Sequence, residues 1–163
     1  MAPTLKPAEM RAWRAFLDAQ ASLLRRLGAD LVKEEEITLA EYDVLVQLRF
    51  APDGRLRMSE LSDRVRLSPS GLTRLVDRLV QGGLVTRGRC ASDRRGSFAI
   101  LTAAGKVRLR RASPVHLRGI REHFSKHLSP AQLEAVAEAL EPLGRDMPVG
   151  SFVPPSSATP RRR

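Results

Sequence analysis

Residues 68–80 read SPSGLTRLVDRLV, and residues 92–102 read SDRRGSFAILT. Serine followed by proline is a helix start signal, because serine caps free backbone N–H groups and proline at the first helical position has no N–H to satisfy. In the second stretch a charged turn runs into a short apolar segment, which is typical of a hairpin strand. A helix followed directly by a charged hairpin is the order that decides the fold.

The segment 68–81 is predicted to be an amphipathic helix with a polar face turned to a partner. Its apolar residues recur at intervals of three and four and so share one side: Leu72, Leu75, Val76, Leu79 and Val80. The other side carries short hydroxyls and then arginines: Ser68, Ser70, Thr73, Arg74 and Arg78. Short donors suit close approach to a phosphate, and arginine can bind guanine with two hydrogen bonds. A short helix predicted at 58–65, with Ser59 as its N-cap, completes a helix-turn-helix.

The hairpin predicted at 84–101 is strongly basic. Arg87, Arg89, Arg94 and Arg95 cluster around its turn. Cationic side chains on a projecting turn can enter a narrow minor groove, where the potential of DNA is most negative. Asp93, like Asp77 on the preceding helix, is expected to orient an arginine rather than to contact phosphate. A helix-turn-helix followed by such a hairpin is a winged helix.

The flanking segments are predicted to be helical, so the chain is mainly α with a small β-wing and has six helices. The first helix begins near Pro7, and the second begins at a capping box formed by Thr38 and Glu41. A fifth helix, capped by Thr102, runs to about residue 128 with a kink or break at Pro114. A sixth is capped by Ser129 and Gln132 and carries an inward stripe of Leu133, Val136, Leu140 and Leu143. The expected regions are a dimerisation helix at 1–37, the winged helix at 38–102, dimerisation helices at 103–147 and a disordered basic tail at 148–163.

Composition points to a polyanionic partner. Of 163 residues, 28 are Lys or Arg and 18 are Asp or Glu, giving a net charge of +10 that suits nucleic acid better than a membrane surface. The single cysteine, Cys90, excludes an intramolecular disulfide and fits a reducing, cytoplasmic location. There is no signal-peptide-like core and no apolar run long enough to span a bilayer. No catalytic arrangement or phosphate-binding loop is recognisable, so neither an enzyme nor a cofactor is predicted.

The stretch MSELSDRVRLSPSGLTRLVDRLVQGGLVTRGRCASDRRGSFAILTAAG, residues 58–105, resembles the winged-helix region of MarR-type transcriptional regulators. The resemblance rests on LTRLVDRL, on the GLV-R segment that leads into the wing, on Asp93 and Arg95 as Asp-x-Arg, and on the closing LT-AG. It implies a homodimer whose first, fifth and sixth helices interlock. It also implies that the fourth helix lies in the major groove and that the wing, with Arg95, lies in the minor groove. A further implication is repression that is relieved by a small, often phenolic, ligand bound between the dimerisation helices and the winged helix.

Physical reasoning also favours a dimer. The terminal helices carry apolar stripes that a second copy would bury, and two reading helices about one DNA turn apart would recognise an inverted repeat. We therefore predict a sequence-specific regulator of double-stranded DNA, acting as a repressor, with a phenolic or carboxylate effector. The alternatives are an architectural DNA-binding protein of the same fold and a winged helix that binds another protein.

Three further sets of residues have candidate roles. Cys90 lies beside Arg89, which could lower its pKa, but thiol sensors that resemble this chain carry the reactive cysteine in the first helix, where this chain has none, so redox sensing is not predicted. His123 and His127 have a spacing that can bind a metal, but Tyr42 follows Glu41 where a related zinc-sensing branch has histidine, so no metal site is predicted. Helix-one residues line the ligand pocket in some relatives, which makes Arg11, Trp13 and Arg14 candidates for that role.

Overall fold

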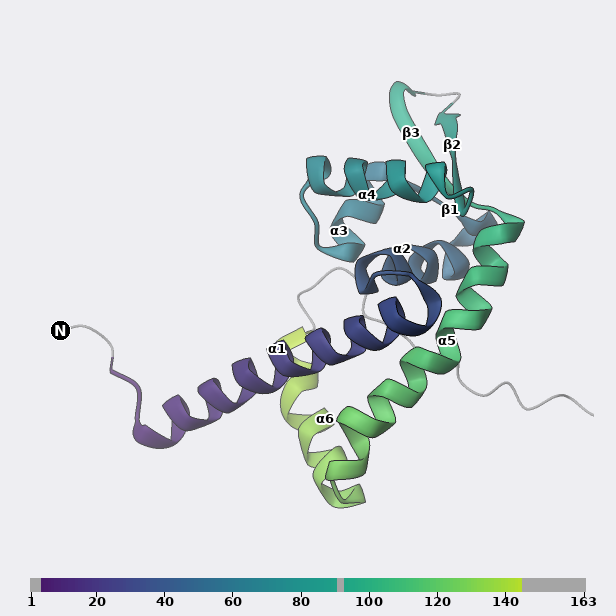
Figure 1. Cartoon of the computed structure of the whole chain (residues 1–163). Coiled ribbons are helices and arrows are strands. Elements are labelled where there is room, and N and C mark those ends of the chain that lie inside the picture. The colour runs from purple at the N-terminus through teal and green to yellow at the C-terminus, as the bar shows by residue number, and fades with distance from the viewer. Residues whose placement is uncertain (1–3, 91–92, 145–163) are drawn as a thin grey trace, which may run out of the picture. The chain divides into compact units, whose positions relative to one another are not determined.

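The computed structural model describes residues 4–90 and 93–144, without the side chains of 89–90 and 93–96. This part of the chain contains six α-helices and one three-stranded antiparallel sheet (Figure 1), which confirms the predicted fold class. The elements are α1 (Pro7–Glu35), α2 (Leu39–Phe50), η1 (Pro52–Gly54), β1 (Arg55–Arg57), α3 (Met58–Val65), α4 (Pro69–Gln81), β2 (Val85–Cys90), β3 (Asp93–Leu101), α5 (Ala103–His123), η2 (Ser125–His127) and α6 (Pro130–Gly144).

Internal contacts divide the described residues into two compact units. The first takes in residues up to 39 and from 110 to 141, so it contains α1, the second half of α5 and most of α6. The second takes in 40–109 and the last described residues, so it contains α2, the sheet, α3, α4 and the start of α5. The functional regions drawn from the sequence, with boundaries at 37, 102 and 147, stay predictions.

The core of the second unit is built on the apolar face of α4, a helix that contacts α3 and β2 (Figure 1). Four of the five predicted residues are at most 2% exposed: Leu72, Leu75, Val76 and Leu79. The fifth, Val80, is 36% exposed, so its assignment to the buried face is wrong. At 3.6 residues per turn Val80 lies about 80° around the helix from Leu72, at the margin of the face.

The predicted hairpin of β2 and β3 is present and is joined by a strand that the sequence did not indicate. The strand order is β1-β3-β2, with Leu56 of β1 opposite Ala99 of β3. Both of these side chains are buried, at 2% and 0% exposure. A three-residue strand between a turn and a helix has too little alternation to be recognised, and its partner lies more than 40 residues later in the chain.

The helix starts of the second unit follow from named caps. The N–H of Gly71 donates to Ser68 Oγ at 3.2 Å, which confirms Ser68 as the N-cap of α4. The N–H of Gly105 donates to Thr102 Oγ1 at 3.0 Å, which confirms the Thr102 cap of α5. Ser59 does not cap α3, because that helix begins at Met58 and its N-cap is Arg57, two residues before Ser59.

Two predictions for the C-terminal helices need correction. Helix α5 ends at His123, not near residue 128, because Phe124 leaves helical geometry with φ −128° and ψ −72°. Pro114 lies inside α5 without breaking it. Ser129 and Gln132 form the predicted capping box, with N–H to side-chain distances of 2.8 and 3.3 Å. The predicted stripe of α6 is not buried in the single chain, since Leu140 is 39% and Leu143 is 77% exposed.

Candidate nucleic-acid interface

The polar face of α4 is exposed and its hydroxyls are held in place. Ser68, Ser70 and Thr73 are all exposed near the helix start. The hydroxyl of Thr73 donates to the carbonyl of Pro69 at 2.8 Å, and the two serine oxygens lie 3.3 Å apart. The N-terminal end of α4 therefore presents short hydroxyl groups at the positive end of the helix dipole, an arrangement that suits an anion.

The two arginines of this face differ in their surroundings. Arg74 is exposed and makes no ion pair or hydrogen bond within the described part of the chain. Arg78 donates from Nε to Glu41 Oε1 of α2 at 3.3 Å, and its side chain is 58% exposed while that of Glu41 is only 15% exposed. Arg74 is thus available to a partner, whereas the direction of Arg78 is fixed by α2.

Helix α4 is also tied to the wing. The guanidinium of Arg87 in β2 donates to Asp77 Oδ1 at 2.7 Å. Asp77 therefore pairs with an arginine, as the sequence predicted for this carboxylate. The sequence did not identify Arg87 as the partner of Asp77, nor Glu41 as the partner of Arg78, because residues on different elements share no periodic signal.

The wing turn is only partly described. Strand β3 begins at Asp93, and β2 ends at Cys90. The side chains of Asp93, Arg94, Arg95 and Cys90 lie outside the described residues. Their assigned functions, the wing contacts of the two arginines, the orienting role of Asp93 and the interpretation of Cys90, stay predictions.

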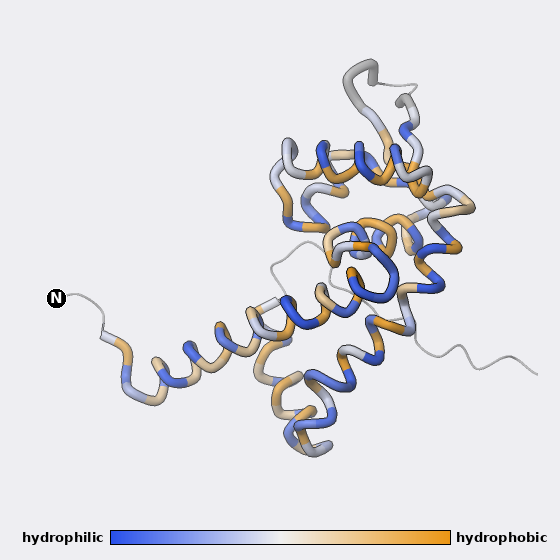
Figure 2. The backbone as a smooth tube through the Cα atoms, viewed as in Figure 1, coloured by the Kyte–Doolittle hydropathy of each residue, from blue (hydrophilic) through white to orange (hydrophobic). Residues whose placement is uncertain are grey.

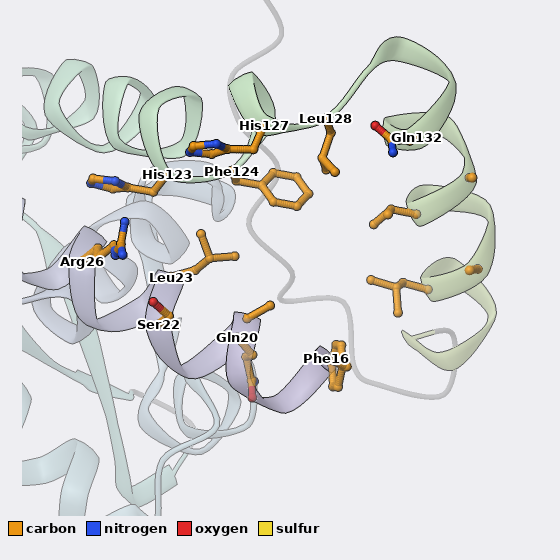
Figure 3. Close-up of a pocket in the computed structure, with 15 residues that line it drawn as sticks. Phe16, Gln20, Ser22, Leu23, Arg26, His123, Phe124, His127, Leu128 and Gln132 are labelled. Carbon is orange, nitrogen blue, oxygen red and sulfur yellow. The ribbon is translucent and has the colours of Figure 1, made fainter. Parts of the chain in front are cut away.

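The first unit contains a cavity of about 880 Å³ between α1, η2 and α6 (Figure 3). Its wall is largely apolar, with Phe16, Leu23, Phe124, Leu128, Val136 and Leu140 among the lining residues, and its polar members include Arg26 and His127. Arg11, Trp13 and Arg14 do not line it. Trp13 is 52% exposed and stacks on Phe16 with ring centroids 6.1 Å apart. The lining comes from residues between 16 and 140, which explains why the sequence did not reveal the cavity.

The two histidines near the end of α5 have separate partners. His123 Nε2 lies 2.8 Å from Asp30 Oδ2 of α1, and His127 Nε2 lies 3.1 Å from the carbonyl oxygen of Glu122. Among residues 4–90 and 93–144, no three His, Cys, Asp or Glu side chains gather as a metal site would require. The same part of the chain has no helix that is both long and apolar enough to cross a membrane.

A short helix, a tight turn and a second helix with an exposed, anion-suited polar face, followed by a basic hairpin, define a winged-helix DNA-binding protein. Comparison with known proteins identifies the family. The MarR family model matches residues 36–96. The chain belongs to the MarR family of DNA-binding transcriptional regulators, and it is not an enzyme.

Solved structures agree with this assignment over nearly the whole chain. AbsC, a MarR family transcriptional regulator from Streptomyces coelicolor, is 35% identical with a TM-score of 0.80, covering 88% of this chain and 97% of AbsC. Sco3205 from the same organism, solved in complex with DNA, is 32% identical with a TM-score of 0.83, covering 94% of this chain and 97% of Sco3205. The transcriptional repressor MdtR of Bacillus subtilis is 29% identical over 138 residues, which are 83% of this chain and 84% of MdtR.

Proposed function

We propose that the protein is a repressor that binds an inverted-repeat operator as a homodimer. The observation that carries this proposal is the exposed polar face of α4 on a helix held by ion pairs on two sides, to α2 and to β2. A reading helix whose orientation is fixed before binding loses little freedom when DNA arrives. The repressor assignment is supported by the similarity to MdtR, which is described as a repressor.

In the proposed complex α4 lies in the major groove and the wing in the adjoining minor groove. The contacts are made by Ser68, Ser70, Thr73, Arg74, Arg78, Arg94 and Arg95. Arg74 has no partner among the described residues and is assigned to a base edge, where a bidentate contact contributes about 1–3 kcal/mol of discrimination. Arg78 is fixed by Glu41 and is assigned to a phosphate.

The homodimer is supported by apolar surface in the first unit. Exposed large residues include Leu5, Trp13, Leu17 and Leu24 of the N-terminal region and Leu140 and Leu143 of α6. Figure 2 shows hydrophobic residues distributed along both α1 and α6. Exposed apolar surface of this extent marks an interaction site. The apolar wall of the cavity adds to this surface. A second copy is the proposed occupant. The cytoplasmic location and a phenolic or carboxylate effector remain parts of the same proposal.

Footprinting on the DNA upstream of the protein's own gene, together with light scattering, tests the proposal. We expect a dimer that protects an inverted repeat and loses roughly 10³-fold or more in affinity between 50 and 200 mM salt. Equal affinity for scrambled DNA would favour an architectural binder instead. Absence of DNA binding at low salt would favour a protein-interaction module. Leu143→Arg is expected to shift the mass toward the monomer, while a dimer of wild-type strength would contradict the assigned interface.

A further inference from the structure

The cavity of the first unit carries an unpaired arginine in a largely apolar wall (Figure 3). Its lining residues all belong to that unit, and among the residues described none of them is an aspartate or a glutamate. The side chain of Arg26 in α1 lines the cavity, is exposed, and makes no ion pair or hydrogen bond within the described part of the chain. Its charge is therefore not neutralised by any described side chain of the cavity wall.

The other large polar groups of the wall are already engaged. His123 Nε2 lies 2.8 Å from Asp30 Oδ2, and His127 Nε2 lies 3.1 Å from a backbone carbonyl oxygen of α5. The side-chain oxygen of Gln132 accepts the N–H of Ser129 at 2.8 Å, as part of the cap of α6. Because these groups bond to the protein itself, the arginine is the group that remains for a ligand.

A hydroxyl lies beside this arginine on the same helix. Ser22 precedes Arg26 by four residues, so the two side chains are one helical turn apart, and both line the cavity (Figure 3). Ser22 is half-buried and makes no hydrogen bond with its side chain within the described part of the chain. A guanidinium and a hydroxyl in this arrangement can donate hydrogen bonds to one carboxylate.

The rest of the wall suits an apolar group. Phe124 leaves helical geometry after His123, and the turn of η2 then places α6 across the cavity from α1 (Figure 3). The apolar wall includes Phe16 and Leu23 of α1 and Val136 of α6. The cavity volume of about 880 Å³ lies within the range of about 300–1,000 Å³ that is typical of small-molecule sites. Burial of an aromatic or aliphatic group against such a wall is favourable.

We propose that this cavity binds an apolar monocarboxylate, with its carboxylate held by Arg26 and Ser22 and its apolar body packed against Phe16 and Phe124. A guanidinium binds a carboxylate through two parallel hydrogen bonds, which a neutral head group cannot match. A second negative charge on the ligand is disfavoured, because the apolar wall would leave it unpaired. The inference rests on the proposed function, because it gives a location to the carboxylate effector named there. The site differs from the one that the family resemblance implies, since it lies wholly within the first unit.

The ligand and a second copy use different parts of α1. Trp13, Leu17 and Leu24 are exposed but do not line the cavity. At 3.6 residues per turn these three positions share a strip of the helix that lies about 100° from the position of Leu23. In the proposed dimer the second copy covers this strip and the open side of the cavity, and the ligand fills the space beneath it.

The test uses the full-length protein without DNA and two aromatic probes of the same shape, 2-naphthoate and 2-naphthamide. Isothermal titration calorimetry at neutral pH measures both affinities. The naphthoate is an anion and the naphthamide is neutral, so the difference between them isolates the contribution of the charge. We expect the wild-type protein to bind naphthoate about tenfold or more tightly than naphthamide, which is the effect of one charge-assisted hydrogen-bonded contact.

Three variants assign the binding to this cavity. Arg26→Gln is expected to lower the affinity for naphthoate about tenfold or more and to leave the affinity for naphthamide nearly unchanged. Arg25→Gln removes the same charge from the neighbouring residue, which is exposed and does not line the cavity, so both affinities are expected to stay at wild-type values. Val136→Trp adds bulk to the wall and is expected to weaken both probes. Circular dichroism and light scattering check that each variant keeps the fold and mass of the wild type.

Equal affinities of the wild type for the two probes would overturn the proposal, and so would wild-type affinity for naphthoate in Arg26→Gln. An equal loss in Arg25→Gln would also overturn it, because the effect would then be that of net charge alone. Unchanged binding in Val136→Trp would place the probe outside the cavity, and no binding of naphthoate at all would leave the cavity to the second copy; either result overturns the ligand site. Because the titrations contain no DNA, these outcomes leave operator binding intact. A wild-type protein that binds no DNA would instead refute the proposed function without changing the titrations.

Discussion

Asp77 and Arg87 join the reading helix to the wing through a contact of 2.7 Å between Oδ1 and the guanidinium. The next residue along α4, Arg78, pairs with Glu41 of α2 at 3.3 Å. Adjacent positions on one helix are thus anchored to two different elements. Because both side chains of the first pair are partly exposed, at 51% and 34%, its effect on stability is small, and its main effect is on the direction of the helix relative to the hairpin.

Asp77→Asn is expected to lower the ratio of operator affinity to scrambled-DNA affinity several-fold. The substitution removes a negative charge, so a purely electrostatic effect would raise both affinities together. Without the pair, the angle between α4 and β2 is no longer fixed. This lowers the affinity for the operator, which requires α4 and the wing to occupy their two grooves in register, but not the affinity for scrambled DNA. Gel shifts on both duplexes measure the ratio. Asp18→Asn, an exposed position of α1, supplies the matched charge control. An unchanged ratio in Asp77→Asn would show that the pair does not position the helix.

Arg74→Ala and Arg78→Ala are expected to weaken DNA binding in different ways. Arg74, which has no partner within the described residues, is assigned to a base, so its loss costs about 1–3 kcal/mol on the operator and little on scrambled DNA. Arg78 is assigned to a phosphate and to Glu41, so its loss lowers both affinities in parallel. Anisotropy titrations on the two duplexes give both values. A parallel loss for Arg74→Ala would contradict its assignment to a base edge.

The sequence predicted those features that local chemistry determines. Ser68, Thr102 and the pair Ser129 and Gln132 cap helices within three residues of their own positions, so short-range patterns were sufficient. The spacing of three and four placed the buried face of α4 correctly except at Val80, where the face ends.

Features that depend on distant residues were not predictable. The pair of Arg78 and Glu41 joins positions 37 residues apart, and β1 is recognised only through its partner strand. The left-handed turn after α3 falls on Arg66, with φ 55°, where no glycine marks it. The stripe of α6 was correctly periodic, but period alone cannot show whether an apolar face is buried within one chain or left open for another.

Gly105→Ala is expected to destabilise the winged helix. A Cβ atom at this position would lie 2.1 Å from the carbonyl oxygen of Leu84 and 2.7 Å from Leu101 Cδ1, so backbone must move. We expect a loss of about 1–3 kcal/mol, measured as a lower unfolding midpoint in denaturant. Gly28→Ala is the matched control, because its Cβ would meet only Leu39 Cβ at 3.8 Å in ordinary contact. Since alanine favours helix, that variant is expected to gain up to about 1 kcal/mol. Equal midpoints for the two variants would contradict the close approach at Gly105.

Asp43→Asn is expected to stabilise the protein at neutral pH and to have no such effect in acid. Burial raises the pKa of Asp43 from its ordinary value of 3.8 to about 6. The folded state therefore holds this proton more tightly than the unfolded state, and stability falls as pH rises from about 4 to about 6, with the full penalty present above that range. At 1.36 kcal/mol per pKa unit the penalty is at most about 3 kcal/mol.

The measurement for Asp43→Asn is the free energy of unfolding at several pH values between 4 and 8, at one protein concentration because a dimer is proposed. Asparagine carries no charge at any of these values, so the variant is expected to exceed wild type at pH 7 and to approach it at pH 4. Burial lowers the pKa of His116, which withdraws stability as pH falls below about 6.5. That contribution is common to both proteins and cancels in their difference. With Asp18→Asn as the exposed control, a difference that stays constant across the range would show that Asp43 does not titrate with a raised pKa.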